Sequence, residues 1–280
     1  MKREFGARLR GSHDRVARPV PEEPPAVRAL LQRRAELLAR RRGVVELPDG
    51  SVVENERGSC FLRRLCYPLD TRHGTLCLGD ALRCDRDRLA ALTDDASVAE
   101  LDLAACTFLD TETTGLSGGA GTVVFMVGLA HFDLDRGELV VEQVFLRSFG
   151  DEPALLQHVS AALRARPHLV TFVGKTFDRH RLAARMSVQR VRSRVLSSRH
   201  LDLYYLARRA WRTELPNVRL QTVERHRLGV QRCDDLPGSA APVAFFDWLR
   251  DGTGPVDLVF EHNRLDVLSL VVLLARLGRG

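Results

Sequence analysis

Short apolar runs and polar turns follow one another through the middle of the chain. Three runs, at 105–110, 123–132 and 139–149, have the length of strands, and a short polar turn at 135–138 separates the last two. Successive strands joined by short connections pair antiparallel. The pattern therefore predicts an antiparallel meander of these runs, with a glycine-rich segment at 114–122 between the first and the second.

Beyond the meander, the spacing of apolar residues changes to that of a helix and then returns to that of a strand. Residues 152–166 repeat apolar side chains at helical spacing, whereas 168–173 has the length and composition of a buried strand. A helix over 178–194, a last strand over 201–205 and helices to the end complete the order. Strands that alternate with helices in this way are typical of a layered α/β domain.

The first hundred residues have a different pattern. We expect a basic arm and helix over 1–42, because a cluster of prolines precedes a stretch rich in Ala, Leu and Arg. Residues 43–100 favour short strands, with turn residues at 48–50, and are predicted to form a small, mostly β unit. The main domain is then expected over 101–280.

The hydropathy and the charge limit the classes of protein to which the chain can belong. No run of eighteen apolar residues occurs and the N-terminus has no apolar leader, so we expect a cytoplasmic protein without a membrane span. The net charge of +6 is unevenly distributed: residues 164–199 contain ten Lys or Arg and one acidic residue. Such asymmetry indicates a polyanionic partner, although a solvated basic helix in an arginine-rich protein gives the same count.

The six cysteines have no paired metal-binding spacing. Four of them, together with His73, lie between residues 60 and 84, but no two are separated by only two residues. Reduced thiols at half-buried strand positions are therefore favoured over a zinc site.

Three short motifs place carboxylates where metal chemistry needs them. In the first, Asp110 and Glu112 are two residues apart at the end of an apolar strand, so they face the same side. Two carboxylates so close repel each other unless a cation lies between them, and carboxylates are ligands that Mg²⁺ and Mn²⁺ prefer. The alternative is an acidic loop edge facing water, and a short D-x-E motif alone would favour that alternative.

The second and third motifs are Gly-Lys-Thr-Phe-Asp178 after a strand and His262-Asn-Arg-Leu-Asp266 in a helical stretch. Asp178 would lie at a strand-to-helix junction, where open α/β sheets bind ligands, or would simply pair with an arginine. His262 and Asp266 are four residues apart and share a helix face. This pair suits a metal ligand beside a proton-accepting imidazole, or an ordinary surface pair.

Taken together, the order and spacing of the motifs resemble those of a known family. The chain is similar to the YprB-type ribonuclease H-like domain of the DEDD 3′–5′ exonuclease superfamily, over about residues 101–278. The supporting strings are 108–116, 118–122, 174–178, 200–203, 207–211, 234–238 and 262–270. The resemblance implies a ribonuclease H-like mixed sheet, in which a three-strand antiparallel meander continues into parallel strands and helices flank the sheet.

The resemblance also implies a phosphodiesterase that uses two divalent cations, Mg²⁺ or Mn²⁺. By the family pattern Asp110 contacts both cations, Glu112 and Asp266 share one, Asp178 holds the other, and His262 is the general base. The substrate implied is a 3′ end of single-stranded DNA or RNA. The basic residues predicted to bind it are Lys175, Arg179, Arg181 and Arg185.

Further positions have alternative interpretations. Asp202 is either a group that supports the site or a helix cap. The aromatic cluster of Phe245, Phe246 and Trp248 favours core packing over base stacking. Val173 departs from the family, which has Asn before the Gly-Lys string, and His262 stands at a spacing that the family uses for Tyr. An endonuclease of the same fold and a non-catalytic nucleic-acid-binding module therefore remain alternatives.

Overall fold

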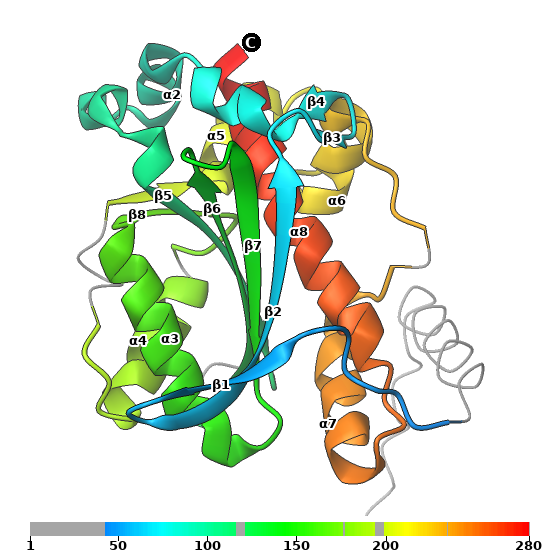
Figure 1. Cartoon of the computed structure of the whole chain (residues 1–280). Helices are drawn as coiled ribbons and strands as arrows, with labels where there is room; N and C mark the ends of the chain where they lie inside the picture. Colours follow the sequence, from blue (N-terminus) through cyan, green and yellow to red (C-terminus); the bar gives the residue numbers. More distant parts are fainter. Residues whose placement is uncertain (1–42, 116–120, 176, 194–198, 234, 280) are drawn as a thin grey trace, which may run out of the picture.

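A single mixed sheet runs through the computed structural model, which describes residues 43–115, 121–175, 177–193, 199–233 and 235–279 (Figure 1). Its strand order is β1-β2-β7-β6-β5-β8-β9. The strands are β1 (Ser51–Asn55), β2 (Gly58–Pro68), β5 (Cys106–Thr113), β6 (Val124–Asp133), β7 (Glu138–Phe145), β8 (His168–Thr171) and β9 (His200–Asp202). A separate two-stranded hairpin joins β3 (Arg72–His73) to β4 (Leu76–Cys77).

The central strands confirm the predicted α/β fold. Strands β5, β6 and β7 form the antiparallel meander, and β8 and β9 add to β5 as parallel strands. Helix α3 (Glu152–Ala165) provides the crossover between β7 and β8, as the helical period of this segment predicts. The carboxyl ends of β5, β8 and β9 therefore point the same way, and Asp110 and Glu112 lie near the end of β5.

The strands of the N-terminal segment extend this sheet. Strand β2 pairs antiparallel with β7 along its length, and β1 pairs with β2. The boundary expected near residue 101 therefore does not separate two sheets. The turn between β1 and β2 is at residues 56–57 instead of the expected 48–50, which precede β1.

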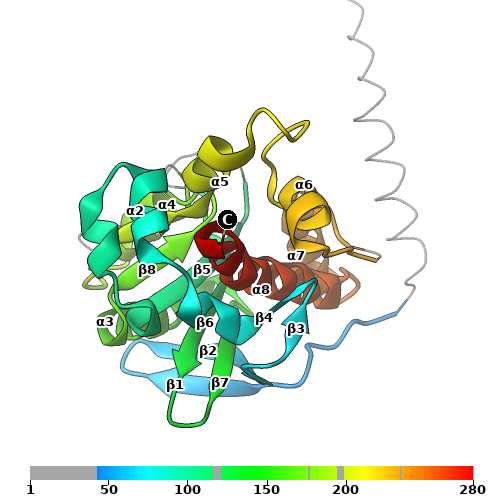
Figure 2. The same ribbon diagram turned by 90° about the horizontal axis from the view of Figure 1, so that it is seen from above.

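Helices cover both faces of the sheet and enclose two apolar cores (Figures 1 and 2). The remaining helices are η1 (Leu78–Arg83), α2 (Arg86–Thr93), η2 (Ala96–Glu100), η3 (Leu103–Ala105), η4 (Phe149–Asp151), α4 (Asp178–Val188), α5 (Leu203–Trp211), α6 (Leu220–Val223), the π-helical η5 (Glu224–Leu228), η6 (Gly238–Ala240), α7 (Ala241–Asp251) and α8 (Val256–Arg279). One core lies under α3, α4 and α7, and the other lies under α5 and the C-terminal half of α8.

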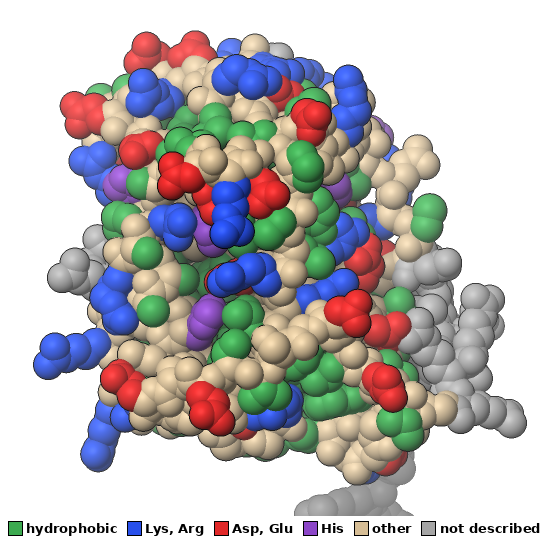
Figure 3. Space-filling view, in the orientation of Figure 1, with side chains coloured by type: hydrophobic (Ala, Val, Ile, Leu, Met, Phe, Trp, Pro, Cys, Tyr) green, Lys and Arg blue, Asp and Glu red, His purple; other side chains and the backbone are tan. Residues whose placement is uncertain are grey.

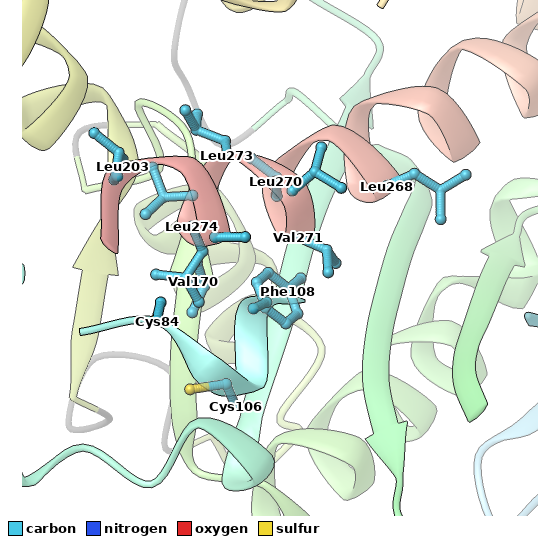
Figure 4. Packing of buried hydrophobic residues seen from close by; sticks show 14 of the residues in the cluster. Cys84, Cys106, Phe108, Val170, Leu203, Leu268, Leu270, Val271, Leu273 and Leu274 are labelled. Carbon is cyan, nitrogen blue, oxygen red and sulfur yellow. The ribbon is translucent and has the colours of Figure 1, made fainter. Parts of the chain in front are cut away.

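The packing of helix α8 on the sheet fixes where along the strands its polar residues lie. Its C-terminal half is apolar nearly all round and packs on β5 and β8, where Leu270, Val271 and Leu274 lie over Phe108 and Val170 (Figure 4). Burial of such side chains gives about 1.5–3 kcal/mol each. This packing holds the preceding turn of the helix, with residues 262–266, beside the end of β5.

Several predicted elements are shorter in the structure. Strand β7 ends at Phe145 instead of 149, and β8 ends at Thr171 instead of 173. The last strand ends at Asp202 instead of 205, because the Asp202 side chain accepts a hydrogen bond from the Tyr204 backbone and caps helix α5. Helix α4 ends at Val188, and Arg190 just beyond it has a positive φ of 54°, which a helix cannot continue through. The predicted helix over 27–42 lies outside the described residues.

Other sequence expectations concern the cysteines, the aromatic cluster and membrane spans. All six cysteines are free thiols, with Cys60, Cys84 and Cys106 buried. Phe245 is fully buried and stacks on Phe125, and Trp248 packs half-buried against the same core, in agreement with core packing, whereas Phe246 is exposed. None of the helices in the described ranges has both the length and the hydropathy that a membrane span requires.

Candidate active site

The two carboxylates of the first motif lie on β5 and face helix α8. Side chains alternate along this strand: Phe108 enters the core under α8, and Leu109 enters the opposite core. The side chains of Asp110 and Glu112 lie on the same face of β5 as that of Phe108, and Glu112 is buried. The shared face that the D-x-E spacing predicts is therefore directed toward α8.

A chain of hydrogen bonds holds Asp110 from the neighbouring strands. Asp110, Gly128 and Gln143 are cross-strand neighbours on β5, β6 and β7. Asn263 of α8 lies over Gly128: its Nδ2 donates to Asp110 Oδ2 at 2.9 Å, and its Oδ1 accepts from Gln143 Nε2 at 3.0 Å. A Cβ on Gly128 would be 2.4 Å from Asn263 Oδ1, so only glycine leaves room for this contact.

Asp178 reaches the same place from the other side of β5. It is the first residue of α4, and its carboxylate accepts a hydrogen bond from the hydroxyl of Thr111. The side chain of Thr111 lies on the opposite face of β5 from that of Asp110. Strand β5 therefore contacts α8 with one face and the start of α4 with the other. A carboxylate in the first turn of a helix also interacts favourably with the helix dipole.

Four carboxylates thus gather around the end of β5, and their charges disfavour one another. Burial, and then the charges of Asp266, Glu112 and Asp178, raise the pKa of Asp110 well above its usual value. Burial is also the main reason that the pKa of Glu112 is raised to about 8 and that of Asp178 to about 7. Such a cluster is electrostatically unfavourable without a compensating cation.

One guanidinium supplies part of that compensation. Arg232 is only 5% exposed and contacts three carboxylates, those of Glu224, Asp235 and Asp266. Its Nε lies 2.8 Å from Glu224 Oε2, and its Nη1 lies 3.1 Å from Asp235 Oδ2. Arg232 therefore ties η5 and the segment before η6 to helix α8.

His262 is buried between two of the same carboxylates. Its Nδ1 lies 2.7 Å from Asp235 Oδ1, and its Nε2 lies 3.5 Å from Asp266 Oδ2. An ionised carboxylate can only accept, so Nδ1 carries the proton and Nε2 is the atom that gains or loses one. Burial alone lowers the pKa of His262, but Asp266, Asp235 and Glu112 together raise it to about 10.

Comparison with known proteins assigns this arrangement to a family. Residues 107–278 match the model of the RNase H superfamily. All four clustered carboxylates, His262 and Arg232 lie inside that range. The chain belongs to the RNase H superfamily.

A curated relative agrees with the resemblance predicted from the motifs. The chain is 35% identical over 225 residues to the uncharacterized protein YprB of Bacillus subtilis (strain 168). The aligned region covers 79% of this chain and 53% of YprB, so the chain spans about half the length of this relative.

Asp202 organises the loop that leads to Asp178. Its carboxylate accepts from the backbone N–H groups of Val173 at 2.8 Å and of Lys175 at 2.9 Å, besides capping α5. Of the two alternatives drawn from the sequence, the helix cap is confirmed, and Asp202 also holds the β8–α4 loop.

Val173 has a backbone conformation that a β-branched residue rarely adopts. Its φ is +64°, in the left-handed region that Gly and Asn tolerate. The Asp202 carboxylate holds the Val173 N–H in this conformation. The family's Asn at this position thus suits the backbone, and Val173 is strained there.

The four basic residues predicted to bind nucleic acid are in different environments. Lys175 is exposed, and Arg179 and Arg181 are half-buried, with Arg181 stacked on the ring of Phe177 at 4.5 Å. Arg185 is buried and its Nε donates to Glu152 Oε1 at 2.6 Å. The expected role of Arg185 at the nucleic-acid surface is therefore wrong, because its guanidinium is used in the core.

The donor set fits divalent cations. Four carboxylates provide hard oxygen ligands, and bound positive charge would relieve the repulsion that, together with burial as the main cause, raises three of their pKa values. In the part of the chain that the structure describes, no three His, Cys, Asp or Glu side chains already have metal-binding spacing. Asn263, Thr111 and Arg232 hold Asp110, Asp178 and Asp266 in the present arrangement.

Several residues of the site were not predicted from the sequence. They are Gly128, Gln143, Glu224, Arg232, Asp235 and Asn263. Asn263 and Asp235 lie in strings that support the family resemblance, and that was the only signal for them. Gly128 and Gln143 lie in ordinary strand patterns, which give no sign of a polar contact across the sheet.

Proposed function

We propose that this protein is a metal-dependent 3′–5′ exonuclease that hydrolyses phosphodiester bonds of DNA or RNA with two divalent cations, Mg²⁺ or Mn²⁺. The observation that carries the proposal is the convergence of Asp110, Glu112, Asp178 and Asp266, from β5, α4 and α8, on one buried place. Burial, and then the charges of Asp266, Glu112 and Asp178, raise the pKa of Asp110, which supports a common cation site.

The four carboxylates would hold the cations, and Asn263 would orient Asp110 among them. When bound, the cations would supply Lewis-acid stabilisation of the attacking and leaving oxygens. Release of Asp266 from Arg232 would free its second oxygen as a ligand. Thr111 would fix one oxygen of Asp178 and direct the other into the site.

His262 would take the proton of the attacking water at Nε2. Asp235 accepts from Nδ1–H and so holds the tautomer in which Nε2 has a free lone pair. The pKa of about 10 describes the acidic cluster without bound cations, and neutralisation of Asp266 and Glu112 would lower it toward the range of a general base. Lys175, Arg179 and Arg181 would contact the phosphates of a single-stranded 3′ end.

The test is a cleavage assay on single-stranded DNA and RNA oligonucleotides labelled at either end, with Mn²⁺, Mg²⁺ or EDTA. We expect metal-dependent shortening from the 3′ end. The Asp110→Asn variant keeps the shape of the side chain but should be slower by at least about a hundredfold, because charge stabilisation by such ions amounts to several kcal/mol. Asp133→Asn, on an exposed end of β6, is the matched control and should cleave normally.

Other outcomes would favour the alternatives. Cleavage within a circular substrate, with no requirement for a free end, would indicate an endonuclease of the same superfamily. Binding without cleavage by a well-folded protein under all metal conditions would contradict the enzyme and favour a binding module.

A further inference from the structure

A cavity of about 630 Å³ lies beside the candidate active site, between α2, η2 and α5. Its lining includes Lys175 from the β8–α4 loop, Tyr205 and Arg208 from α5, and Arg212 just after α5. Its size is that of small-ligand sites in proteins. Helix α2 and η2 precede the RNase H match at residue 107, so four of the thirteen lining residues come from outside the matched region.

Unpaired cations gather at this cavity. Within the described ranges Lys175, Arg208 and Arg212 make no ion pair, whereas arginines such as Arg185 and Arg232 are bound to carboxylates. The two acidic side chains of the lining, Asp95 and Asp202, accept backbone N–H groups, and Asp202 is buried. The cavity therefore has a net positive charge that a phosphate can approach.

An aromatic ring lies among these cations. Tyr205 is 42% exposed, and Lys175 Nζ lies 5.8 Å from the centre of its ring. The pKa of His200, on the same wall, is lowered to about 3 by burial and by the charges of Arg179, Lys175 and His180, so this residue is neutral. An exposed ring beside cations is the combination with which proteins hold a base and its phosphate.

The cavity and the carboxylate cluster share the β8–α4 loop. Lys175 is three residues before Asp178, in the loop that Asp202 holds by two backbone hydrogen bonds. By contrast, Figure 3 shows Lys and Arg interspersed with Asp and Glu over the face it presents, without a region of one sign. The cavity thus differs from this face of the molecule in two ways: its cations are unpaired, and it shares the β8–α4 loop with the candidate active site.

We propose that this cavity binds a nucleotide of a single-stranded nucleic acid next to the bond that is cleaved, with the base on Tyr205 and phosphates on Lys175, Arg208 and Arg212. The ligand class rests on the proposed nuclease function. A single strand is required because the faces of paired bases are already stacked in a duplex and cannot reach Tyr205.

The experiment is fluorescence anisotropy with labelled single-stranded DNA and RNA of mixed sequence and with a duplex, on the full chain in EDTA so that no cleavage occurs. The Arg208→Ala/Arg212→Ala variant should bind single strands about tenfold more weakly. Its slope of log affinity against log salt should be shallower by about 1.4, since each phosphate contact in a single strand contributes about 0.7. The matched control is Arg136→Ala/Arg250→Ala, which removes the same charge from the β6–β7 turn and from α7 (Figure 2).

The ring is tested separately from the charge. Tyr205→Ala should weaken binding on the order of tenfold, the magnitude of one stacked base, whereas Tyr205→Phe should bind as the wild type does. All five side chains changed in the pocket and control variants are exposed, so thermal unfolding should be unaffected, and weaker binding at an unchanged Tm supports direct contact.

The results separate this inference from the proposed function. Equal affinities of the pocket double variant and its control, a failure of Tyr205→Ala to weaken binding, or equally tight duplex binding would overturn the cavity as a single-strand site. So would a wild-type protein that binds no oligonucleotide. Binding that depends on the pocket residues, without cleavage in Mn²⁺, would support the cavity as a binding site and contradict the proposed nuclease activity. Cleavage with an unchanged KM in the pocket variants would support the nuclease activity and contradict the cavity as a binding site.

Discussion

At the scale of single residues, the backbone conformation of Val173 gives a departure from the family pattern an energetic cost. The sequence marks Val173 only as a missing Asn, whose amide might have contacted substrate or water. The structure adds a φ of +64° at an exposed side chain, held by the Asp202 carboxylate. The strain belongs to the folded state alone, so it lowers the stability of the protein whatever the amide does for substrate.

We therefore expect Val173→Asn to stabilise the protein by about 1 kcal/mol, because Asn adopts the left-handed region with much less strain than a β-branched residue. Thermal unfolding measures this as a Tm raised by a few degrees. Val188→Asn is the control, since Val188 is also exposed but ends helix α4 with ordinary helical geometry. A lower Tm for Val173→Asn would show that the valine side chain makes a contact worth more than the strain.

At the scale of elements, one buried guanidinium joins segments that no regular hydrogen bonding connects. Arg232 lies in an irregular stretch, yet it binds Glu224 of the π-helical η5, Asp235 before η6 and Asp266 of α8. Without it, three carboxylates would lie close together with little access to water. The pKa of Arg232 is raised well above its usual value: burial opposes this rise, and Asp266, Glu224 and Asp235 together outweigh burial.

Arg232→Gln should therefore destabilise the protein by roughly 3–5 kcal/mol, the usual cost of leaving buried charges without their partner. Urea unfolding at neutral pH measures the loss. Arg250→Gln removes an arginine from exposed ion pairs on α7 and should leave the urea midpoint nearly unchanged. If both variants lose equally little, the Arg232 contacts are dispensable for the fold.

At the scale of the whole molecule, the stability of the metal-free protein should depend on pH through the acidic cluster. Glu112 and Asp178 have pKa values near 8 and 7 in the folded protein, against ordinary values of 4.5 and 3.8. A raised pKa contributes stability below the ordinary value, and this contribution is lost as pH rises through the folded value. His262, raised to about 10, changes in the same direction at higher pH.

In EDTA the Tm should therefore fall as pH rises from 5 to 8. Added Mn²⁺ should raise the Tm, and more at pH 8 than at pH 6, because cations bind the deprotonated carboxylates of the folded protein. Differential scanning fluorimetry over this range measures both effects, and Asp110→Asn should reduce each of them. A Tm that rises from pH 5 to 8 in EDTA would show that the cluster is not unfavourable, and would remove the electrostatic reason for a cation there.

The sequence by itself determined the order of elements and the shared face of Asp110 and Glu112, because both depend on local patterns. Strand and helix periods are visible within ten to fifteen residues, and the spacing of Asp110 and Glu112 fixes their common face on any strand. The family resemblance then connected this pair to Asp178, His262 and Asp266. The expected helix end at 194, strand end at 205 and turn at 48–50 differ because they depend on single caps, which tertiary contacts decide.

Only the tertiary structure decided which polar residues meet. Gln143 and Asn263 are 120 residues apart, and nothing in their own strand or helix indicates that Gly128 leaves room for them to reach Asp110. Likewise, Arg185 belongs to a basic segment by sequence but pairs with Glu152 in the core, while Arg208 and Arg212 face an open cavity. Charge along a chain is a local property, whereas burial and partners depend on how the sheet and its helices pack, and that packing determines which arginines are free to meet a phosphate.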